Sequence, residues 1–272
     1  MLFRSLGGFV LIRFAPLLEQ ALAARSLLLL FGLLTAIAAG MVMLTRISIK
    51  VRLAWSTVAQ MGFMILECGL ALFPLALLHI VAHSLYKAHS FLASGGAVER
   101  IAAIRRPGPV AIPDARAVGR AFVSALAIYA FVGLAFGLPH KSPQAIALGA
   151  ILIFGVAYML AQGFADAAPR ALTRRTAVYA LATSVGYFAL QMAATFLTAG
   201  VLPVTPAPGP LEWVLIVLAV LSFGVVAIVQ AMFPLWAYHP AAAGLRVHLS
   251  NGFYANAIFD RLVGGWSSRG AS

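Results

Sequence analysis

The sequence predicts an all-α fold, a polytopic membrane helix bundle with about seven to eight transmembrane helices. Hydrophobic residues make up 62% of the chain and charged residues only 10%, with a mean hydropathy of +0.98. That composition excludes an ordinary soluble domain. Several apolar runs reach the roughly 20 residues that cross a hydrocarbon core of ~30 Å. They lack the short alternating period of membrane barrel strands, so helices are predicted.

Seven segments are long enough to span a bilayer, and a shorter apolar piece at 6–18 precedes them as a partial span. The seven run over 27–44, 54–73, 74–96, 121–138, 144–164, 177–200 and 211–234. Prolines mark turns between them, at Pro74, Pro139, Pro143, Pro203 and Pro210. We therefore expect residues 1–272 to form a single membrane domain, followed after the last span by a tail at 237–272.

The chain has a formal net charge of +12, and the placement of its positive residues predicts how it is oriented in the membrane. Lys and Arg lie almost entirely between the apolar runs, so we expect a lipid bilayer and no nucleic acid as partner. They gather at 45–53, 97–120, 165–176 and in the tail, whereas the opposite side has little more than Arg25 and Lys141. An even number of spans separates successive basic loops. The positive-inside rule then predicts a multi-pass protein of the cell membrane, the inner membrane in bacteria, with these loops and the C-terminus in the cytoplasm.

The segment "HIVAHSLYKAHSF" at 79–91 places ionisable side chains inside a predicted span. His79, His83 and Lys87 recur every four residues, which puts them on one helix face over about 12 Å of its axis. Such groups are costly in hydrocarbon and usually mark an ion pathway. We expect a polar ladder that faces the protein interior.

The preceding span carries a second polar line. Ser56, Gln60 and Glu67 share a helix face, and a tight turn predicted at Phe73 and Pro74 joins the two spans. The two lines are therefore expected to meet in the interior. The candidate residues of a proton pathway are His79, His83, Lys87, Glu67, Gln60 and Lys50.

These residue types suit proton transfer. A histidine accepts a proton on one ring nitrogen and donates from the other, and a lysine in a low-dielectric site loses much of its preference for the charged form. A carboxylate such as Glu67 beside Lys87 would oppose that loss. The hypothesis is that Lys87 is the switching charge, that a pair with Glu67 opens and closes to set its proton affinity, and that His79 and His83 are the relay.

Several alternatives remain open from the residues alone. Polar groups in a membrane often only hydrogen-bond helices together, and Glu67 is equally well explained as such a contact. Zinc at His79 and His83 lacks a third ligand, so no metal is expected, nor any other cofactor or catalytic residue. Ser56 is better explained as a helix cap or backbone contact than as an ion ligand, and Lys50 is either a cytoplasmic anchor or a point of proton uptake.

Two stretches carry a family resemblance. "IKVRLAWSTVAQMGFM" at 49–64 and "HIVAHSLYKAHSFLASGG" at 79–96 resemble the paired-helix signature of the antiporter-like membrane subunits. That superfamily includes the largest membrane subunit of respiratory complex I and the multi-subunit Mrp sodium/proton antiporters. The resemblance implies the antiporter-like fold, and it implies that Lys87, His79 and His83 belong to the central proton pathway.

One branch fits better. "ALLHIVAHSLYKAHSFL" and the terminal "RVHLSNGFYANAIFDRLVG" are similar to the membrane subunit of the DAB-type dissolved inorganic carbon transporter. This implies a proton or sodium flux that energises a large zinc-containing soluble partner, DabA-like, on the cytoplasmic side, where carbon dioxide becomes trapped bicarbonate. Members have about fourteen helices, so we expect a C-terminal fragment that supplies the second half of the fold. The later spans contain no central lysine matching the exit residue of the family.

Two other functions stay open. The first is a proton-pumping subunit of an NADH-quinone oxidoreductase or an Mrp-type complex, where other chains perform any enzymatic chemistry. The second is a non-transporting structural membrane fragment, whose polar stripe only holds helices together. In neither case, nor in the carbon transporter, is the chain expected to be an enzyme by itself.

Overall fold

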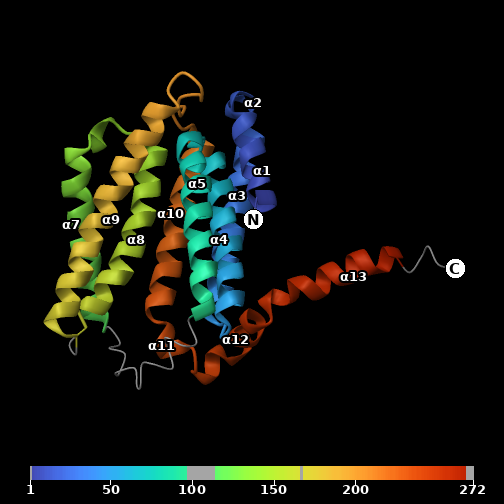
Figure 1. The fold of residues 1–272 in the computed structure, drawn as a ribbon, viewed down its shortest axis with the longest axis vertical. Coiled ribbons are helices and arrows are strands. Elements are labelled where there is room, and N and C mark those ends of the chain that lie inside the picture. The colour runs from blue at the N-terminus through green and yellow to red at the C-terminus, as the bar shows by residue number, and fades with distance from the viewer. Residues whose placement is uncertain (1, 97–113, 166–167, 268–272) are drawn as a thin grey trace.

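The computed structural model describes residues 2–96, 114–165 and 168–267, and all regular structure in these ranges is helical. Seven long helices form the body of the molecule (Figure 1). They are α3 (Leu22–Leu44), α4 (Ile49–Gly69), α5 (Phe73–Ala93), α7 (Ala115–Ala135), α8 (Pro143–Gly163), α9 (Arg170–Leu197) and α10 (Pro210–Ala231). The shorter helices are α1 (Leu2–Arg13), α2 (Ala15–Gln20), α11 (Phe233–Trp236), α12 (Ala243–Ser250) and α13 (Ala255–Ser267).

Each predicted span corresponds to one of the long helices, but every helix begins earlier than predicted. The difference reaches seven residues for α9, which begins at Arg170 instead of 177. A hydropathy pattern misses first-turn charges such as Lys50 and Arg52, although the helix continues through them. The partial span at 6–18 is divided at Phe14 into α1 and α2, with Pro16 in the first turn of α2.

Within the described residues, five helices are both long and apolar enough to cross a membrane: α3, α7, α8, α9 and α10. The prediction was seven to eight. α4 and α5 have the necessary length, at 21 residues each, but their polar side chains lower their hydropathy. α1 has 12 residues, too few to span a bilayer. The two long helices with low hydropathy are therefore the two that carry the polar lines.

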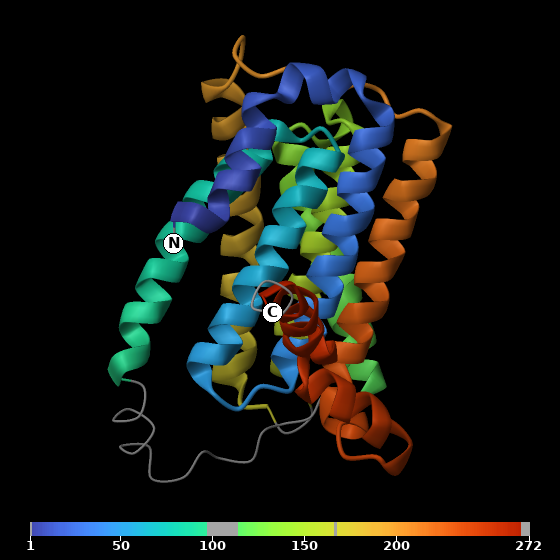
Figure 2. The same cartoon turned by 90° about the vertical axis from the view of Figure 1, so that its right-hand side faces the viewer.

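The long helices pack as two groups. α3, α4 and α5 form one group with α1 against it, and α7, α8 and α9 form the other (Figure 1). α10 packs on α8 and α3, and α5 reaches α9, so these contacts join the groups. α2 and the segment 201–209 cross one end of the bundle, and the C-terminal helices lie at the other (Figure 2). We call these the α2 end and the tail end.

Glycines allow α3 and α4 to approach closely. A Cβ atom on Gly32 would lie 2.5 Å from the backbone nitrogen of Leu66, and one on Gly69 would lie 2.6 Å from that of Leu29. Gly62 is equally tight, because its Cβ would lie 2.7 Å from the backbone nitrogen of Ala36. Helices in lipid associate through such close packing, since no hydrophobic effect drives them together. The contact fixes α4, and with it the polar residues that α4 carries.

The turn between α4 and α5 lies at residues 70–72, not at Phe73 and Pro74 as predicted. Phe73 is already the first residue of α5, and Pro74 occupies its first turn, where a missing N–H does no harm. Ala71 has a left-handed backbone with φ of 56°, and the Leu72 N–H donates to the Glu67 carbonyl at 2.9 Å. This short connection makes α4 and α5 an antiparallel hairpin.

The glycine contact predicts a difference between two substitutions on the same helix. Gly32→Ala places a methyl group against the backbone of α4, which cannot give way as a side chain would, so we expect a loss of about 1–3 kcal/mol in stability. Gly40→Ala is the matched control, because nothing lies within 4 Å of its Cβ position and alanine favours the helix. The apparent melting temperature in detergent, followed by size-exclusion chromatography, measures both. Equal melting temperatures for the two variants would contradict this account of the interface.

Candidate functional site: a polar cavity between the two helix groups

A cavity of about 1110 Å³ lies between the two helix groups, with walls from α3, α4, α5, α8, α9 and α10. The polar lines of α4 and α5 both face it. Six side chains of these lines are in its wall: Ser56, Gln60, Glu67, His79, His83 and Lys87. The structure therefore brings together five of the six predicted pathway residues, together with Ser56.

Glu67 and His79 form the contact nearest the α4–α5 turn. His79 Nδ1 lies 3.0 Å from Glu67 Oε2, and the glutamate is buried. With the carboxylate ionised, Nδ1 is the donor, and the Nε2 atom of a neutral ring is then free to accept a hydrogen bond. The ring of Phe63 lies against His79, with centroids 5.8 Å apart. The pair is thus oriented by its own hydrogen bond and by packing.

His83 is the next member of the stripe. Its ring centroid lies 5.9 Å from that of His79, one helical turn away. The side chain is buried, and its Nε2 atom has no hydrogen-bond partner among the described residues. Buried polar atoms normally have a partner, and water supplies one where the surroundings are polar and roomy. His83 is therefore the member of the stripe with unfilled hydrogen-bonding capacity.

Lys87 lies toward the tail end of the cavity and is only 2% exposed. Its Nζ atom donates to the hydroxyl of Ser56, and the Leu53 carbonyl is 3.5 Å away. Ser56 in turn donates to the same carbonyl at 2.9 Å. In the described part of the chain no carboxylate forms a salt bridge with Lys87. The Nζ atom also lies 5.6 Å from the centroid of the Tyr86 ring, so the contacts of this ammonium among the described residues are all with neutral groups.

The predicted pair of Glu67 with Lys87 is wrong. Glu67 contacts His79, and Lys87 contacts Ser56. The reason is the antiparallel hairpin: Ser56 and Lys87 lie about equally far in sequence from Ala71, whereas Glu67 is close to the turn. Side chains at the two ends of such a hairpin do not meet.

Four other polar residues of α4 and α5 are placed differently from the ladder residues. Gln60 is in the cavity wall but is exposed, and Lys50 is an exposed residue of the first turn of α4 that does not line the cavity. Arg52, two residues further along α4, does line it. His89 is exposed and lies outside the cavity wall, as its position off the stripe predicts.

The cavity also has polar wall residues that sequence reasoning missed. Tyr158 from α8, Tyr187 from α9 and Gln230 from α10 belong to its lining. The Tyr187 hydroxyl is buried and has no hydrogen-bond partner among the described residues. In the sequence, each of these residues is a single polar or amphipathic side chain inside an otherwise apolar run. One such side chain is weak evidence for a site, and it becomes informative only when the fold brings several of these helices together.

The described part of the chain contains no cluster of three or more His, Cys, Asp or Glu side chains arranged to hold a metal ion. Of the two neighbouring histidines, His79 is the one that contacts Glu67. The chemistry that this arrangement supports is proton exchange along a line of hydrogen-bonding groups, from carboxylate to imidazole to ammonium.

Comparison with known proteins finds a family match for the part of the chain that contains the α4–α5 hairpin. Residues 1–107 match the family described as NADH:quinone oxidoreductase/Mrp antiporter, transmembrane. The chain is 34% identical over 263 residues to the probable inorganic carbon transporter subunit DabB2 of Halothiobacillus neapolitanus, a match that covers 94% of this chain and 47% of the relative. The chain thus spans about half the length of that relative.

Two shorter matches each cover about a third of this chain. The probable inorganic carbon transporter subunit DabB of Hydrogenovibrio crunogenus is 57% identical over 95 residues, which is 35% of this chain and 18% of that protein. NADH-ubiquinone oxidoreductase chain 5 of Metridium senile is 38% identical over 96 residues, 35% of this chain and 16% of that protein. Residues 1–107, which include the polar hairpin, thus match the NADH:quinone oxidoreductase/Mrp antiporter membrane family, and the chain is similar along nearly all its length to one probable inorganic carbon transporter subunit.

Proposed function

We propose that this chain is the cation-translocating membrane part of a dissolved inorganic carbon uptake complex, moving protons or sodium to energise a cytoplasmic partner. The observation that carries the proposal is the line of ionisable groups, buried or half-buried, from Glu67 through His79 and His83 to Lys87 along one cavity wall. Similarity over 94% of the chain to a protein named as an inorganic carbon transporter subunit supports the choice of complex.

The line works as a relay with a switch at one end. His79, held by Glu67 through Nδ1, exchanges a proton through Nε2 with His83, whose own Nε2 atom is free for a water. Lys87 is the switching charge, because among the described residues its ammonium contacts neutral groups: the Ser56 hydroxyl, a backbone carbonyl and the ring of Tyr86. A proton that moves onto or off Lys87 changes the charge at the tail end of the cavity. Gln60 in the wall and Lys50 near the tail end are the proposed uptake side of the path.

We propose further that α4 and α5 cross the membrane beside the five apolar helices, as one membrane domain. Their polar faces turn into the cavity, while the exposed residues of α5 include Val81, Leu85 and Leu92, which suit contact with lipid. The basic loops and the tail then lie in the cytoplasm, which makes the tail end the cytoplasmic end.

The proposed partner is a large zinc-containing soluble subunit, DabA-like, at that end. The word "subunit" in the names of the carbon transporter relatives supports membership of a complex. The runner-up is a proton-pumping subunit of an NADH-quinone oxidoreductase or Mrp-type complex, which the shorter match to oxidoreductase chain 5 of Metridium senile favours. A non-transporting structural fragment is the third possibility.

The relay predicts a contrast between two histidines of α5. His83→Ala and Lys87→Met break the line, and we expect cation-coupled uptake of radiolabelled inorganic carbon to fall by roughly tenfold or more in cells that express the whole protein with its partner. His89→Ala is the control, because this histidine is exposed and outside the cavity wall. Uptake that survives Lys87→Met at the parental rate would support the structural-fragment alternative instead.

The proposed orientation predicts the behaviour of reporter fusions. Green fluorescent protein fused after Ser272 should fluoresce, and alkaline phosphatase fused there should be inactive, because the positive-inside rule places the tail in the cytoplasm. Alkaline phosphatase inserted after Ala71, in the α4–α5 turn, should be active if both helices cross the bilayer. The opposite pattern at the turn would mean that the hairpin does not span the membrane.

The choice of complex predicts what purifies with the chain. Affinity purification of the full-length protein in mild detergent should recover a large soluble protein with about one zinc per copy, measured by mass spectrometry and metal analysis. Recovery of quinone oxidoreductase subunits in its place would favour the runner-up.

A further inference from the structure

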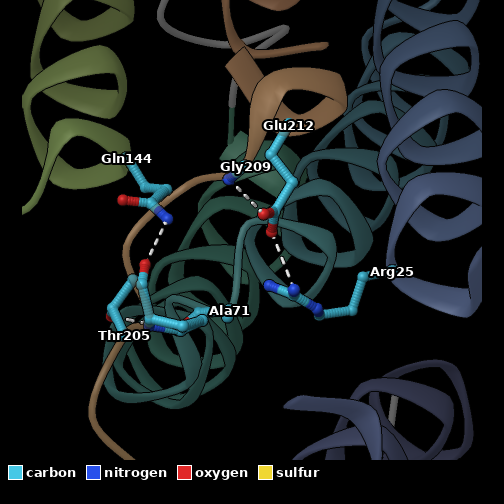
Figure 3. Close-up of polar contacts among 7 residues, drawn as sticks. Arg25, Ala71, Gln144, Thr205, Gly209 and Glu212 are labelled. Carbon is cyan, nitrogen blue, oxygen red and sulfur yellow. Dashed lines mark hydrogen bonds and ion pairs between the residues drawn. The ribbon is translucent and has the colours of Figure 1, made fainter. Parts of the chain in front are cut away.

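A second buried polar cluster lies at the α2 end, apart from the large cavity. Arg25 of α3 is 5% exposed, and its Nη2 atom lies 2.7 Å from Glu212 Oε1 of α10 (Figure 3). Sequence reasoning took Arg25 for one of the few loop charges on this side of the membrane. The structure instead places it inside the first turn of a long helix, in an ion pair that is largely out of contact with solvent.

Both carboxylate oxygens of Glu212 are engaged. Oε2 accepts the backbone N–H of Gly209 at 2.7 Å and so caps α10, while Oε1 faces Arg25. A carboxylate in the first turn of a helix is favourably placed against the helix dipole. The ion pair therefore ties α3 to the N-terminus of α10.

The segment 201–209 is tied down over the same end of the bundle. Gln144, in the first turn of α8, donates through Nε2 to the Pro206 carbonyl at 2.8 Å. The Thr205 hydroxyl donates to the carbonyl of Ala71, in the α4–α5 turn, at 3.1 Å (Figure 3). Together with the ion pair, these bonds link α3, α8, α10 and the α4–α5 turn.

Four polar atoms of this cluster have unfilled hydrogen-bonding capacity. Arg25 Nε and Nη1, Ser26 Oγ and Gln144 Oε1 are buried and have no partner among the described residues. All three residues line a small cavity of about 10 Å³, which is the size of a single water. Two donors from the guanidinium, a hydroxyl and an amide oxygen supply the partners that a buried water needs.

An apolar layer separates this cluster from the large cavity. Leu29, Leu70 and Leu215 line the small cavity, while Leu75 and Leu148 line the large one, and all five belong to one buried hydrophobic cluster. An ion crosses such a dry layer only at high cost unless the helices around it move apart. The bonds of the polar cluster hold those helices together.

We propose that Arg25, Glu212, Gln144 and Ser26, with one bound water, form a latch that keeps the α2 end of the ion path closed. This proposal rests on the proposed function, since it assigns the gate of the same path. A cation that reaches the Glu212 carboxylate competes with Arg25 for it and so loosens the latch. Release then lets α3, α8 and α10 separate around the apolar layer.

A thiol reporter tests the latch. Cys68 is the single cysteine of the chain and is buried, so Cys68→Ala gives a background without thiols. Ser26→Cys in that background puts a near-isosteric thiol into the small cavity. A membrane-impermeant methanethiosulfonate reagent, added to right-side-out vesicles, should label it slowly, and adding Glu212→Gln should speed labelling by roughly tenfold or more.

Matched variants separate the latch from misfolding. Glu19→Gln, on α2 at the same end, should leave the labelling rate unchanged. If Glu212→Gln alone leaves the buried guanidinium unpaired and prevents folding, the double variant Arg25→Met with Glu212→Gln removes both charges and should fold and label fast. Labelling at the parental rate in every folded variant would overturn the proposal.

The water and the function have separate readouts. An experimental structure that resolves waters should show one within about 3.2 Å of both Arg25 Nε and Gln144 Oε1, and a dry cavity there would remove the water from the latch. Labelling rates do not depend on transport. Unchanged labelling with Lys87-dependent uptake would therefore sink the latch alone, and fast labelling with uptake independent of Lys87 would sink the proposed function alone.

Discussion

Ionisable side chains within a membrane must be kept from lipid, and this constraint shapes the whole molecule. The α4–α5 hairpin satisfies it by turning both polar lines into one cavity between two helix groups. Close glycine contacts hold α4 against α3, so α4 presents a fixed face to that cavity. The apolar helices around the hairpin then act as its shield, and the low hydropathy of α4 and α5 reflects what they carry inside the bundle.

The hairpin also decides which charges meet. Because the chain reverses at residues 70–72, Glu67 lies beside His79 and Ser56 lies beside Lys87. The carboxylate is thus at one end of the stripe and the ammonium at the other, with His83 between them. A separated acid and base joined by an imidazole is a better proton path than a contact ion pair, since a tight pair holds its proton in place.

The bundle contains two different polar sites along its length, and a layer of leucines separates them. The large cavity contains the ladder, and the small cluster of Arg25, Gln144 and Glu212 lies beyond the apolar layer at the α2 end. The segment 201–209 closes over that cluster through its bonds to Gln144 and Ala71. A Pro-rich turn without charge is thereby part of the packing at this end, and its prolines suit a fixed, extended course.

Much of the fold follows from the sequence by itself. Local hydropathy predicts the helical class and the seven long helices. A period of four residues predicts the polar stripe on α5 and its counterpart on α4. Both signals depend only on residues that are close together in the chain. Family resemblance at 49–64 and 79–96 is of the same kind, because it too is a property of contiguous letters, and residues 1–107 do match that family.

Tertiary structure alone decided the pairings. The partner of Lys87 is Ser56 and not Glu67, and Arg25, which looks like a loop charge, is buried against Glu212, 187 residues later in the chain. Neither contact leaves a periodic signal, because the energy of an ion pair or hydrogen bond depends on distances of a few ångströms between atoms that the fold brings together. Sequence determines which faces are polar, but only the packing of helices determines what each polar face meets.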